Sequence, residues 1–198
     1  IKIGMVNDTD TIHAIAETLA KYKGKYQYLI IDPVMVSTSG SRLMQEDALD
    51  TFVKELLPLA TLLTPNIPEA EILAGIKIQN ADDIKAAAAA ISQLGCKYVL
   101  IKGGHFTGTE KIDYLFEDGK QRTSYRGISI DTRNTHGTGC TLSSAITSYL
   151  AREFDMNTAI AMAKTYLSGA ILAGKGVNIG EGHGPVNHFY EPKSLFIK

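Results

Sequence analysis

The chain has 198 residues, and 44% of them are hydrophobic, which is enough for one sizeable core. Its 20 lysines and arginines nearly balance its 21 aspartates and glutamates, and the net charge of −1 argues against a nucleic-acid-binding protein. No apolar run approaches the roughly 20 residues of a membrane span, and the two cysteines form no disulfide framework, so we expect a cytoplasmic protein without a membrane partner.

Apolar runs alternate with helical patterns along the first half of the chain. The chain opens directly on a strand pattern, and we therefore expect that residues upstream are missing. The expected strands are 1–6, 26–32, 60–66 and 97–105, and the expected helices are 8–22, 46–60, 67–75 and 81–95. This alternation predicts an α/β fold with a mostly parallel sheet that is covered on both faces.

The pattern changes in the second half. Residues 113–130 alternate around Asp118-Gly119, which predicts a small β hairpin or flap. Two helices, 141–153 and 157–173, and a glycine-rich tail follow. No internal repeat or linker separates these parts, so we expect a single domain over residues 1–198.

Polar residues gather where the predicted parallel strands end. They are Asn7 with Asp8, Asp32, Asn66 with Glu69, Lys102 and His105. In open parallel sheets, ligands bind outside the carboxyl ends of the strands. Asp32 could instead cap a turn before Pro33, and Asn66 could be only a helix cap. Lys102 ends an apolar strand before two glycines, which is a poor place for a purely solvated charge.

A glycine-rich loop, "THGTGCTL" at residues 135–142, opens one of the helices. Gly-Thr-Gly at a helix start offers unpaired backbone N–H groups and the positive end of the helix dipole to an anion. The same field favours the thiolate form of Cys140. The loop predicts an anion site beside a potential base, or else a tight turn followed by a small core cysteine.

Six segments together resemble one branch of the ribokinase superfamily. They are "KIGMV", "DPVMVSTSG", "LLTPNIPEAEILAG", "IKGGH", "NTHGTGCTLSSAI" and "GHGPVNHF", in the order of that family and over nearly the whole chain. The resemblance is to the hydroxymethylpyrimidine/phosphomethylpyrimidine kinases of thiamine biosynthesis. It implies a ribokinase-like three-layer α/β sandwich with a small β flap, the use of ATP and Mg²⁺, and phosphorylation of a hydroxymethyl group on a heteroaromatic ring, first on the pyrimidine alcohol and then on its monophosphate.

The resemblance assigns roles to residues of this sequence. Cys140 would be the base that takes the proton of the substrate hydroxymethyl group. The other assignments are an anion hole formed by Gly137, Thr138 and Gly139; nucleotide contacts from Asn66, Glu69, Lys102 and Thr138; a metal held by Asp32 and Glu69; and apolar walls of the pyrimidine pocket from Met5 and Val34.

One departure from the family stands out. The family begins with a glycine-rich strand and turn that supplies an Asp and a Gln to the substrate pocket, and this sequence contains no such segment. The central strand and half of the substrate contacts are therefore expected upstream of Ile1. The choice between a pyrimidine and pyridoxal or pyridoxine as the substrate depends largely on that segment, so a pyridoxal kinase is the main alternative.

Two further alternatives belong to other classes of protein. One is a hydrolase or acyltransferase with Cys140 as the nucleophile and His136 as the base, although four residues across a glycine turn is an awkward geometry. The other is a non-catalytic ligand-binding remnant. His136 could orient a phosphate or stabilise its loop, and Cys96 is interpreted as an inert core thiol. The open edge of the hairpin, together with the resemblance, predicts a homodimer.

Overall fold

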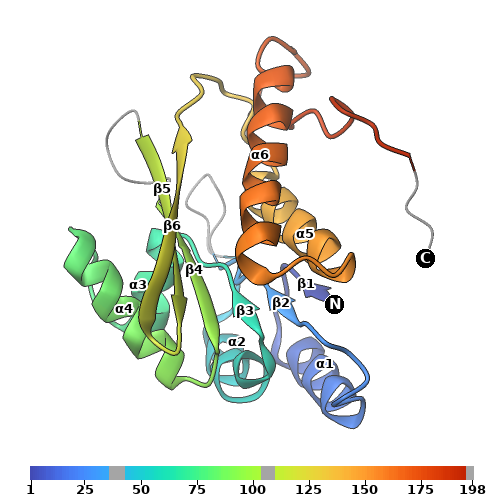
Figure 1. Cartoon of the computed structure of the whole chain (residues 1–198). Coiled ribbons are helices and arrows are strands. Elements are labelled where there is room, and N and C mark those ends of the chain that lie inside the picture. Colours follow the sequence, from blue (N-terminus) through green and yellow to red (C-terminus); the bar gives the residue numbers. More distant parts are fainter. Residues whose placement is uncertain (36–42, 104–109, 195–198) are drawn as a thin grey trace. The chain divides into compact units, whose positions relative to one another are not determined.

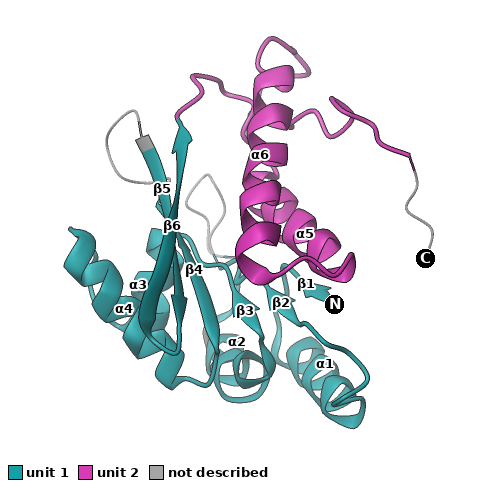
Figure 2. Cartoon of the chain, in the orientation of Figure 1, with its two compact units in different colours: residues 1–128 teal, residues 129–198 magenta. Residues whose placement is uncertain are grey.

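The computed structural model describes residues 1–35, 43–103 and 110–194 (Figure 1). The chain divides into two compact units, Ile1–Ile128 and Ser129–Lys198 (Figure 2). A single domain over residues 1–198 stays a prediction. Among the described residues, no helix combines the length and the apolar character needed to cross a membrane.

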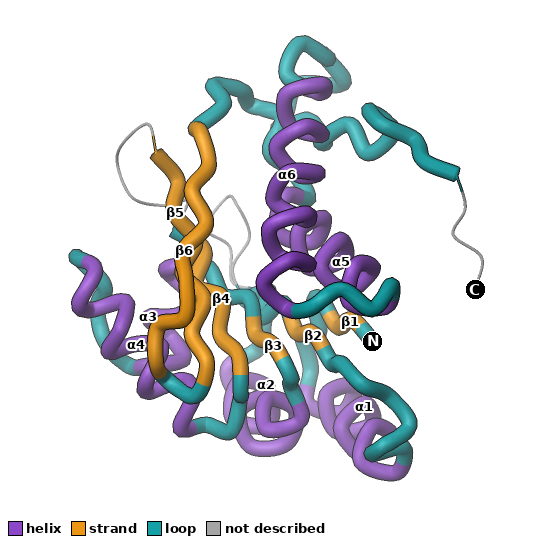
Figure 3. Tube along the Cα trace, viewed as in Figure 1, coloured by secondary structure: helices purple, strands orange, loops and turns teal. Residues whose placement is uncertain are grey.

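Unit 1 is built on a mixed sheet in the order β1-β2-β3-β4-β5-β6 (Figure 3). The strands are β1 (Lys2–Ile3), β2 (Ile30–Ile31), β3 (Leu62–Leu63), β4 (Tyr98–Lys102), β5 (Glu110–Glu117) and β6 (Lys120–Ile128). The first four strands pair in parallel, as predicted, and β5 and β6 extend the sheet in antiparallel fashion.

The parallel strands are shorter than the sequence predicts. The expected strands 26–32 and 60–66 become two-residue ladders, and 1–6 becomes Lys2–Ile3. Pro33 and Pro65 follow shortly after β2 and β3. Because proline has no backbone N–H to donate, it cannot continue a ladder in the interior of a sheet. The strands therefore end just where the polar residues of the carboxyl edge begin.

Unit 1 contains four α-helices among the described residues, and a side chain caps the start of each except the second. They are α1 (Thr9–Lys21), α2 (Glu46–Thr51), α3 (Ile67–Ala74) and α4 (Ala81–Gln93). Asp8 caps α1 by accepting the Thr11 amide at 2.8 Å, and Asn80 caps α4 through the amides of Asp82 and Asp83.

Residues 46–59 of the expected helix 46–60 are helical, but the type of helix changes along them. After α2 the backbone forms a π-helical turn (Phe52–Leu56) and then a 3-10 turn (Leu57–Leu59). Pro58 lies within the second turn and cannot donate the bond to the carbonyl four residues earlier, which interrupts the α-helical ladder. The segment still buries one apolar face, since Phe52 and Leu56 are both enclosed.

The core of unit 1 follows from the parallel register. Ile3 aligns with Ile31, Ile31 with Leu63, and Leu63 with Val99, so these four side chains point to one face of the sheet. The buried cluster that they form includes Ile12 and other residues of α1 to α4. This apolar layer fixes the strands side by side and so fixes the edge at which they end.

The predicted hairpin is present. β5 and β6 are joined by Asp118 and Gly119, with Glu117 opposite Lys120. Both turn residues have positive φ, 49° and 73°, as a two-residue turn between twisted strands requires. β6 forms the edge of the sheet beyond β5.

Unit 2 contains two helices, α5 (Thr138–Ala151) and α6 (Met156–Gly174). The sequence predicted 141–153 for the first, but that helix begins three residues earlier. Gly137 adopts a left-handed conformation with φ of 84° and lets the chain enter the helix directly. The Thr-Gly-Cys part of the predicted loop is therefore the first turn of α5.

We expect Gly119→Ala to destabilise the protein by about 1–2 kcal/mol, because an L-residue with a Cβ is strained at φ of 73°. The new Cβ would also lie 3.3 Å from the Cα atom of Ala89 on α4. Urea unfolding measures the change. Gly182→Ala is the matched control, since nothing lies near a Cβ at that position. Equal stability of the two variants would contradict the turn geometry.

Candidate active site

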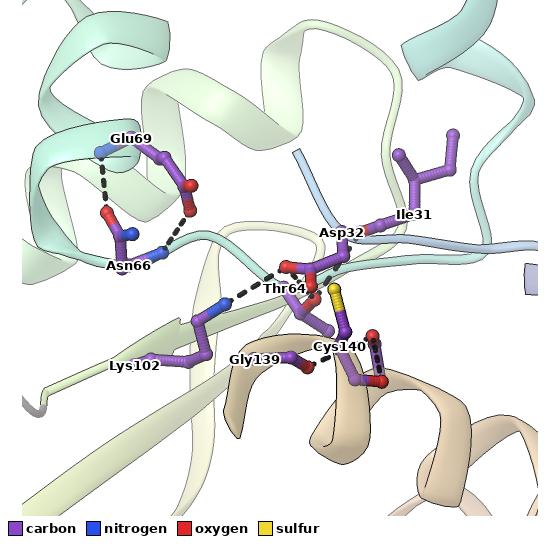
Figure 4. A network of polar contacts seen from close by, with 9 residues as sticks. Ile31, Asp32, Thr64, Asn66, Glu69, Lys102, Gly139 and Cys140 are labelled. Atoms are coloured by element: carbon purple, nitrogen blue, oxygen red, sulfur yellow. Dashed lines mark hydrogen bonds and ion pairs between the residues drawn. The ribbon is translucent and has the colours of Figure 1, made fainter. Parts of the chain in front are cut away.

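The carboxyl edge of the unit 1 sheet carries a buried ion pair. Lys102 Nζ lies 3.0 Å from Asp32 Oδ1, and the two side chains are 15% and 2% exposed. The Thr64 hydroxyl donates to the same carboxylate oxygen at 3.2 Å (Figure 4). Asp32 follows β2, Thr64 follows β3 and Lys102 ends β4, so three neighbouring strand ends meet at one carboxylate.

Asn66 and Glu69 form the capping box of α3 beside this pair. The Asn66 side chain accepts the Glu69 amide at 2.9 Å, and the Glu69 carboxylate accepts the Asn66 amide at 2.8 Å. The helix-cap alternative for Asn66 is therefore correct as a description of its structure. A short parallel bridge joins the backbones of Asn66 and Lys102, which places the cap next to the end of β4.

Glu69 is the electrostatically unusual member of this group. Its side chain is almost fully enclosed, and burial raises the pKa of its carboxyl group. The attraction of Lys102 and the hydrogen bond from the Asn66 amide oppose that rise, whereas Asp32 adds to it. Two carboxylates thus share one ammonium group, and the cluster in its ionised form carries one negative charge in excess.

Close packing explains why the residue after Lys102 is a glycine, and the sequence alone does not show this. A Cβ at Gly103 would lie 1.8 Å from the carbonyl oxygen of Ile112 on β5. The Gly103 amide donates to the buried carboxylate of Asp113 at 3.0 Å. β5 is therefore held directly against the end of β4. His105, which the sequence places at the same edge, lies outside the described residues.

The two predicted wall residues of the pyrimidine pocket also follow strand ends. Met5 comes after β1 and is 60% exposed, and Val34 comes after β2 and is half-buried. The amide of Asp32 donates to the carbonyl of Ile3 at 2.9 Å, so the two segments leave adjacent, hydrogen-bonded strands. Apolar side chains at this edge are available to contact a ring.

The start of α5 in unit 2 is open to an anion. Side chains cap α1, α3, α4 and α6, but no side chain caps α5. Within the described residues the amides of Gly139 and Cys140 make no hydrogen bond. Nothing lies within 4 Å of a Cβ built on Gly137, so this glycine is required by its φ and not by crowding. Such a helix start satisfies its amides by binding an anion or water.

The tail of unit 2 supports this loop through residues that the sequence analysis did not assign. Asn134 is buried, and its side-chain amide donates to the carbonyls of Gly174 and Val177 at 2.7 and 2.6 Å. A Cβ at Gly184 would lie 2.2 Å from Asn134 Oδ1. The His136 amide donates to the Gly184 carbonyl at 3.1 Å, so the main chain of His136 has the loop-stabilising role that was one of its two predicted roles.

A cavity of about 640 Å³ runs along α5 within unit 2. Its lining begins at His136, Gly137 and Cys140 and continues to Arg152 at the far end of the helix. The start of α5 and Cys140 therefore border the same space. Figure 4 shows the thiol projecting from the first turn of the helix.

The two cysteines have opposite environments. Cys96 is buried, its thiol donates to the Tyr98 carbonyl at 3.0 Å, and burial raises its pKa to about 12. The interpretation of Cys96 as a core thiol agrees with this placement. Cys140 is exposed, so the alternative of a small core residue at that position is wrong.

A carboxylate–ammonium pair at the carboxyl edge of a parallel sheet, and a helix start open to anions, are features of an α/β enzyme that handles phosphate groups. The family model described as phosphomethylpyrimidine kinase matches residues 1–187. The chain belongs to this family of kinases.

Curated relatives agree with the family. The chain is 45% identical over 191 residues to the hydroxymethylpyrimidine/phosphomethylpyrimidine kinase of Rhizobium meliloti, covering 96% of this chain and 70% of that protein. It is 43% identical to the thiamine biosynthesis bifunctional protein ThiED of Geobacter sulfurreducens, covering 95% of this chain and 37% of that protein. The predicted enzyme class, a phosphomethylpyrimidine kinase of thiamine biosynthesis, is confirmed.

Solved structures support the predicted ribokinase-like α/β fold. The phosphomethylpyrimidine kinase of Clostridium difficile matches with a TM-score of 0.73 and 45% identity, over 86% of this chain and 68% of that chain. A pyridoxal kinase of Staphylococcus aureus, solved with AMP-PCP and pyridoxal, matches with a TM-score of 0.81 and 31% identity, over 95% and 66%. The chain spans about two thirds of each of these kinases, and the pyrimidine kinases are the better supported relatives.

We expect an alkylating reagent such as iodoacetamide to modify Cys140 and to spare Cys96 in the folded protein, since a buried thiol with a pKa of about 12 offers almost no thiolate. Peptide mass spectrometry after a short reaction measures both sites. The same reaction in urea should modify both cysteines. Equal modification of the two thiols without urea would contradict their placement.

Proposed function

We propose that the protein transfers the terminal phosphoryl group of ATP to the hydroxymethyl oxygen of 4-amino-5-hydroxymethyl-2-methylpyrimidine and then to its monophosphate. The observation that carries the proposal is the open start of α5, where the amides of Gly139 and Cys140 have no partner among the described residues. Family membership supplies the reaction class.

Each functional residue of the chain has its own role in the proposed phosphoryl transfer. Gly137, Thr138 and Gly139 present the helix start to the phosphoryl group in transfer and stabilise the charge that it develops. Cys140, as a thiolate, takes the proton of the substrate hydroxymethyl group. The alcohol oxygen bonds to the terminal phosphorus, the bond from that phosphorus to the bridging oxygen breaks, and ADP leaves. Lys102 neutralises phosphate charge, and Asn66 contacts the nucleotide. These roles require Lys102 and Cys140 to act on the same bound ATP and alcohol. This requirement is part of the proposal.

Asp32 and Glu69 fit a magnesium ion. Among the described residues no group of three histidine, cysteine, aspartate or glutamate side chains could hold a metal alone. Mg²⁺ is commonly bound by one or two carboxylates together with water and substrate phosphates, and the two carboxylates provide that donor set. Burial opposes the charged form of Glu69, and a cation beside it would favour that form. When bound, Mg²⁺ would shield the negative charge of the phosphates.

A pyridoxal kinase is the second candidate for the substrate, since a pyridoxal kinase is among the similar structures. We assign the pyrimidine to this chain because the family model and the curated relatives are pyrimidine kinases. Met5 and Val34 would contact the ring in either case. Turnover of the two alcohols by the intact protein, side by side, distinguishes the candidates.

We expect Cys140→Ala to lower kcat for the pyrimidine alcohol by about 10²–10⁴, the usual contribution of a positioned acid–base group, with ATP binding almost unchanged. Cys140→Asp should recover part of the rate because a carboxylate is also a base. Lys102→Ala should behave differently and raise KM for ATP as well as lower kcat. Steady-state kinetics with Mg-ATP measures all three variants.

Near-wild-type turnover by Cys140→Ala would overturn the assignment of the base. Cys96→Ala is the matched control, because it removes the other thiol from a buried position away from the carboxyl edge. A wild-type protein that phosphorylates neither alcohol would contradict the proposed function itself.

A homodimer is the proposed assembly, in a cytoplasmic setting that suits two free thiols. β6 is an edge strand in the order of the sheet, and Ile128 at its end is 85% exposed. An open edge with an apolar end is a surface that a second copy can cover.

Light scattering at micromolar concentration should give the mass of a dimer. Ile128→Lys should shift the protein toward the monomer, since a charge would be placed in the covered surface. The matched control is Leu172→Lys, which changes an exposed apolar residue outside β6, on α6. A monomer mass for the wild-type protein would count against the dimer.

A further inference from the structure

The tail of unit 2 is bonded to both flanks of the anion-binding loop. We refer to residues 184–188 as the tail strap. At one end of the strap, the Gly184 carbonyl accepts the amide of His136, the residue before Gly137. At the other end, His188 Nε2 lies 2.9 Å from the hydroxyl oxygen of Thr141, the residue after Cys140 in the first turn of α5.

The strap is itself fixed to α6. The Asn187 amide donates to the Ala170 carbonyl at 3.0 Å, and the Tyr166 hydroxyl donates to the carbonyl of His188 at 2.9 Å. A Cβ at Gly174 would lie 3.0 Å from the Asn187 nitrogen, so the close approach depends on that glycine. The imidazole of His188 is thus presented to Thr141 from an anchored backbone.

The hydroxyl of Thr141 behaves unlike others on the helices. Thr18, Thr147 and Thr165 each donate to the carbonyl four residues earlier in their own helix, at 2.7 to 3.1 Å. This return bond is the usual one for a helical threonine. Thr141, which is only 7% exposed, contacts His188 instead. An interaction that replaces the local bond links α5 specifically to the strap.

We propose that His188 is a positioning residue for phosphoryl transfer. Through the hydroxyl of Thr141 it fixes the first turn of α5, which carries the amides of Gly139 and Cys140 and the thiol of Cys140. The inference rests on the proposed function of that turn. A displacement of about 1 Å in a reacting group can lower a rate by up to about 100-fold, so a single hydrogen bond at this place has a large effect on turnover.

A double-mutant cycle in the intact protein tests the proposal. His188→Ala and Thr141→Val should each lower kcat by about 10-fold or more, with a smaller change in KM for the pyrimidine. The double variant should be no slower than the worse single variant, because both changes remove the same interaction. Thr141→Ser keeps the hydroxyl and should retain activity. Thr147→Val is the matched control on the same helix and should leave kcat unchanged.

A second readout does not depend on turnover. The rate of Cys140 alkylation should change in His188→Ala and Thr141→Val and stay at the wild-type value in Thr147→Val. Thermal unfolding shows whether each variant is folded, and His188→Phe, which keeps a ring but has no ring nitrogen, replaces the alanine variant if that one is not.

The outcomes separate the two proposals. Single variants with wild-type kcat and wild-type alkylation, or rate losses that multiply in the double variant, would overturn the role of His188. A wild-type protein without kinase activity would contradict the proposed function, whereas the alkylation rates would still decide whether His188 positions the turn.

Discussion

The carboxylate of Asp32 and the ammonium group of Lys102 are taken out of water at the edge of the unit 1 sheet, 3.0 Å apart. Each buried charge would cost several kcal/mol without a partner, so the pair is stable only if the ends of β2 and β4 are held in a fixed relation. β3 lies between them in parallel register and contributes the hydroxyl of Thr64 to the same oxygen. The polar edge and the apolar layer of the sheet are therefore one arrangement, since the layer aligns the strands whose ends form the ion pair.

In unit 2, hydrogen bonds to the tail fix the loop. Neutral hydrogen bonds from Asn134 and His136 hold the loop to the tail, and glycines at 174 and 184 allow the backbones to approach. Support by neutral hydrogen bonds suits a helix start that binds an anion, because a carboxylate cap at Gly137 would occupy the amides and repel a phosphate. The support of the loop comes from residues that leave the amides of Gly139 and Cys140 without a hydrogen bond among the described residues.

The sequence predicted those features that depend on neighbouring residues. The hairpin turn at Asp118-Gly119 and the glycine entry to α5 each follow from local chemistry, and the parallel order follows from the alternation of strands and helices. The bonds of Asn134 and His188 were not predicted, because they join residues about 40 or more positions apart. The motif "GHGPVNHF" was a signal for them, but a motif names its residues without naming the loop they contact. The strands 26–32 and 60–66 were predicted too long, because their apolar pattern continues up to Pro33 and Pro65 whereas the ladder ends before these prolines.

The contrast between the starts of α3 and α5 limits what Asn66 can do in the proposed reaction. The capping box uses Asn66 Oδ1 for the Glu69 amide and a carboxylate oxygen of Glu69 for the Asn66 amide, so α3 is closed to an anion at these groups. A contact between Asn66 and a nucleotide phosphate would then have to come from its side-chain NH₂ group, which the box leaves out. α5 has no cap and offers backbone amides instead. The two helix starts are therefore not equivalent phosphate sites: α5 offers backbone amides that no side chain caps, whereas at the start of α3 the capping box occupies the Asn66 and Glu69 amides and leaves the NH₂ group of Asn66.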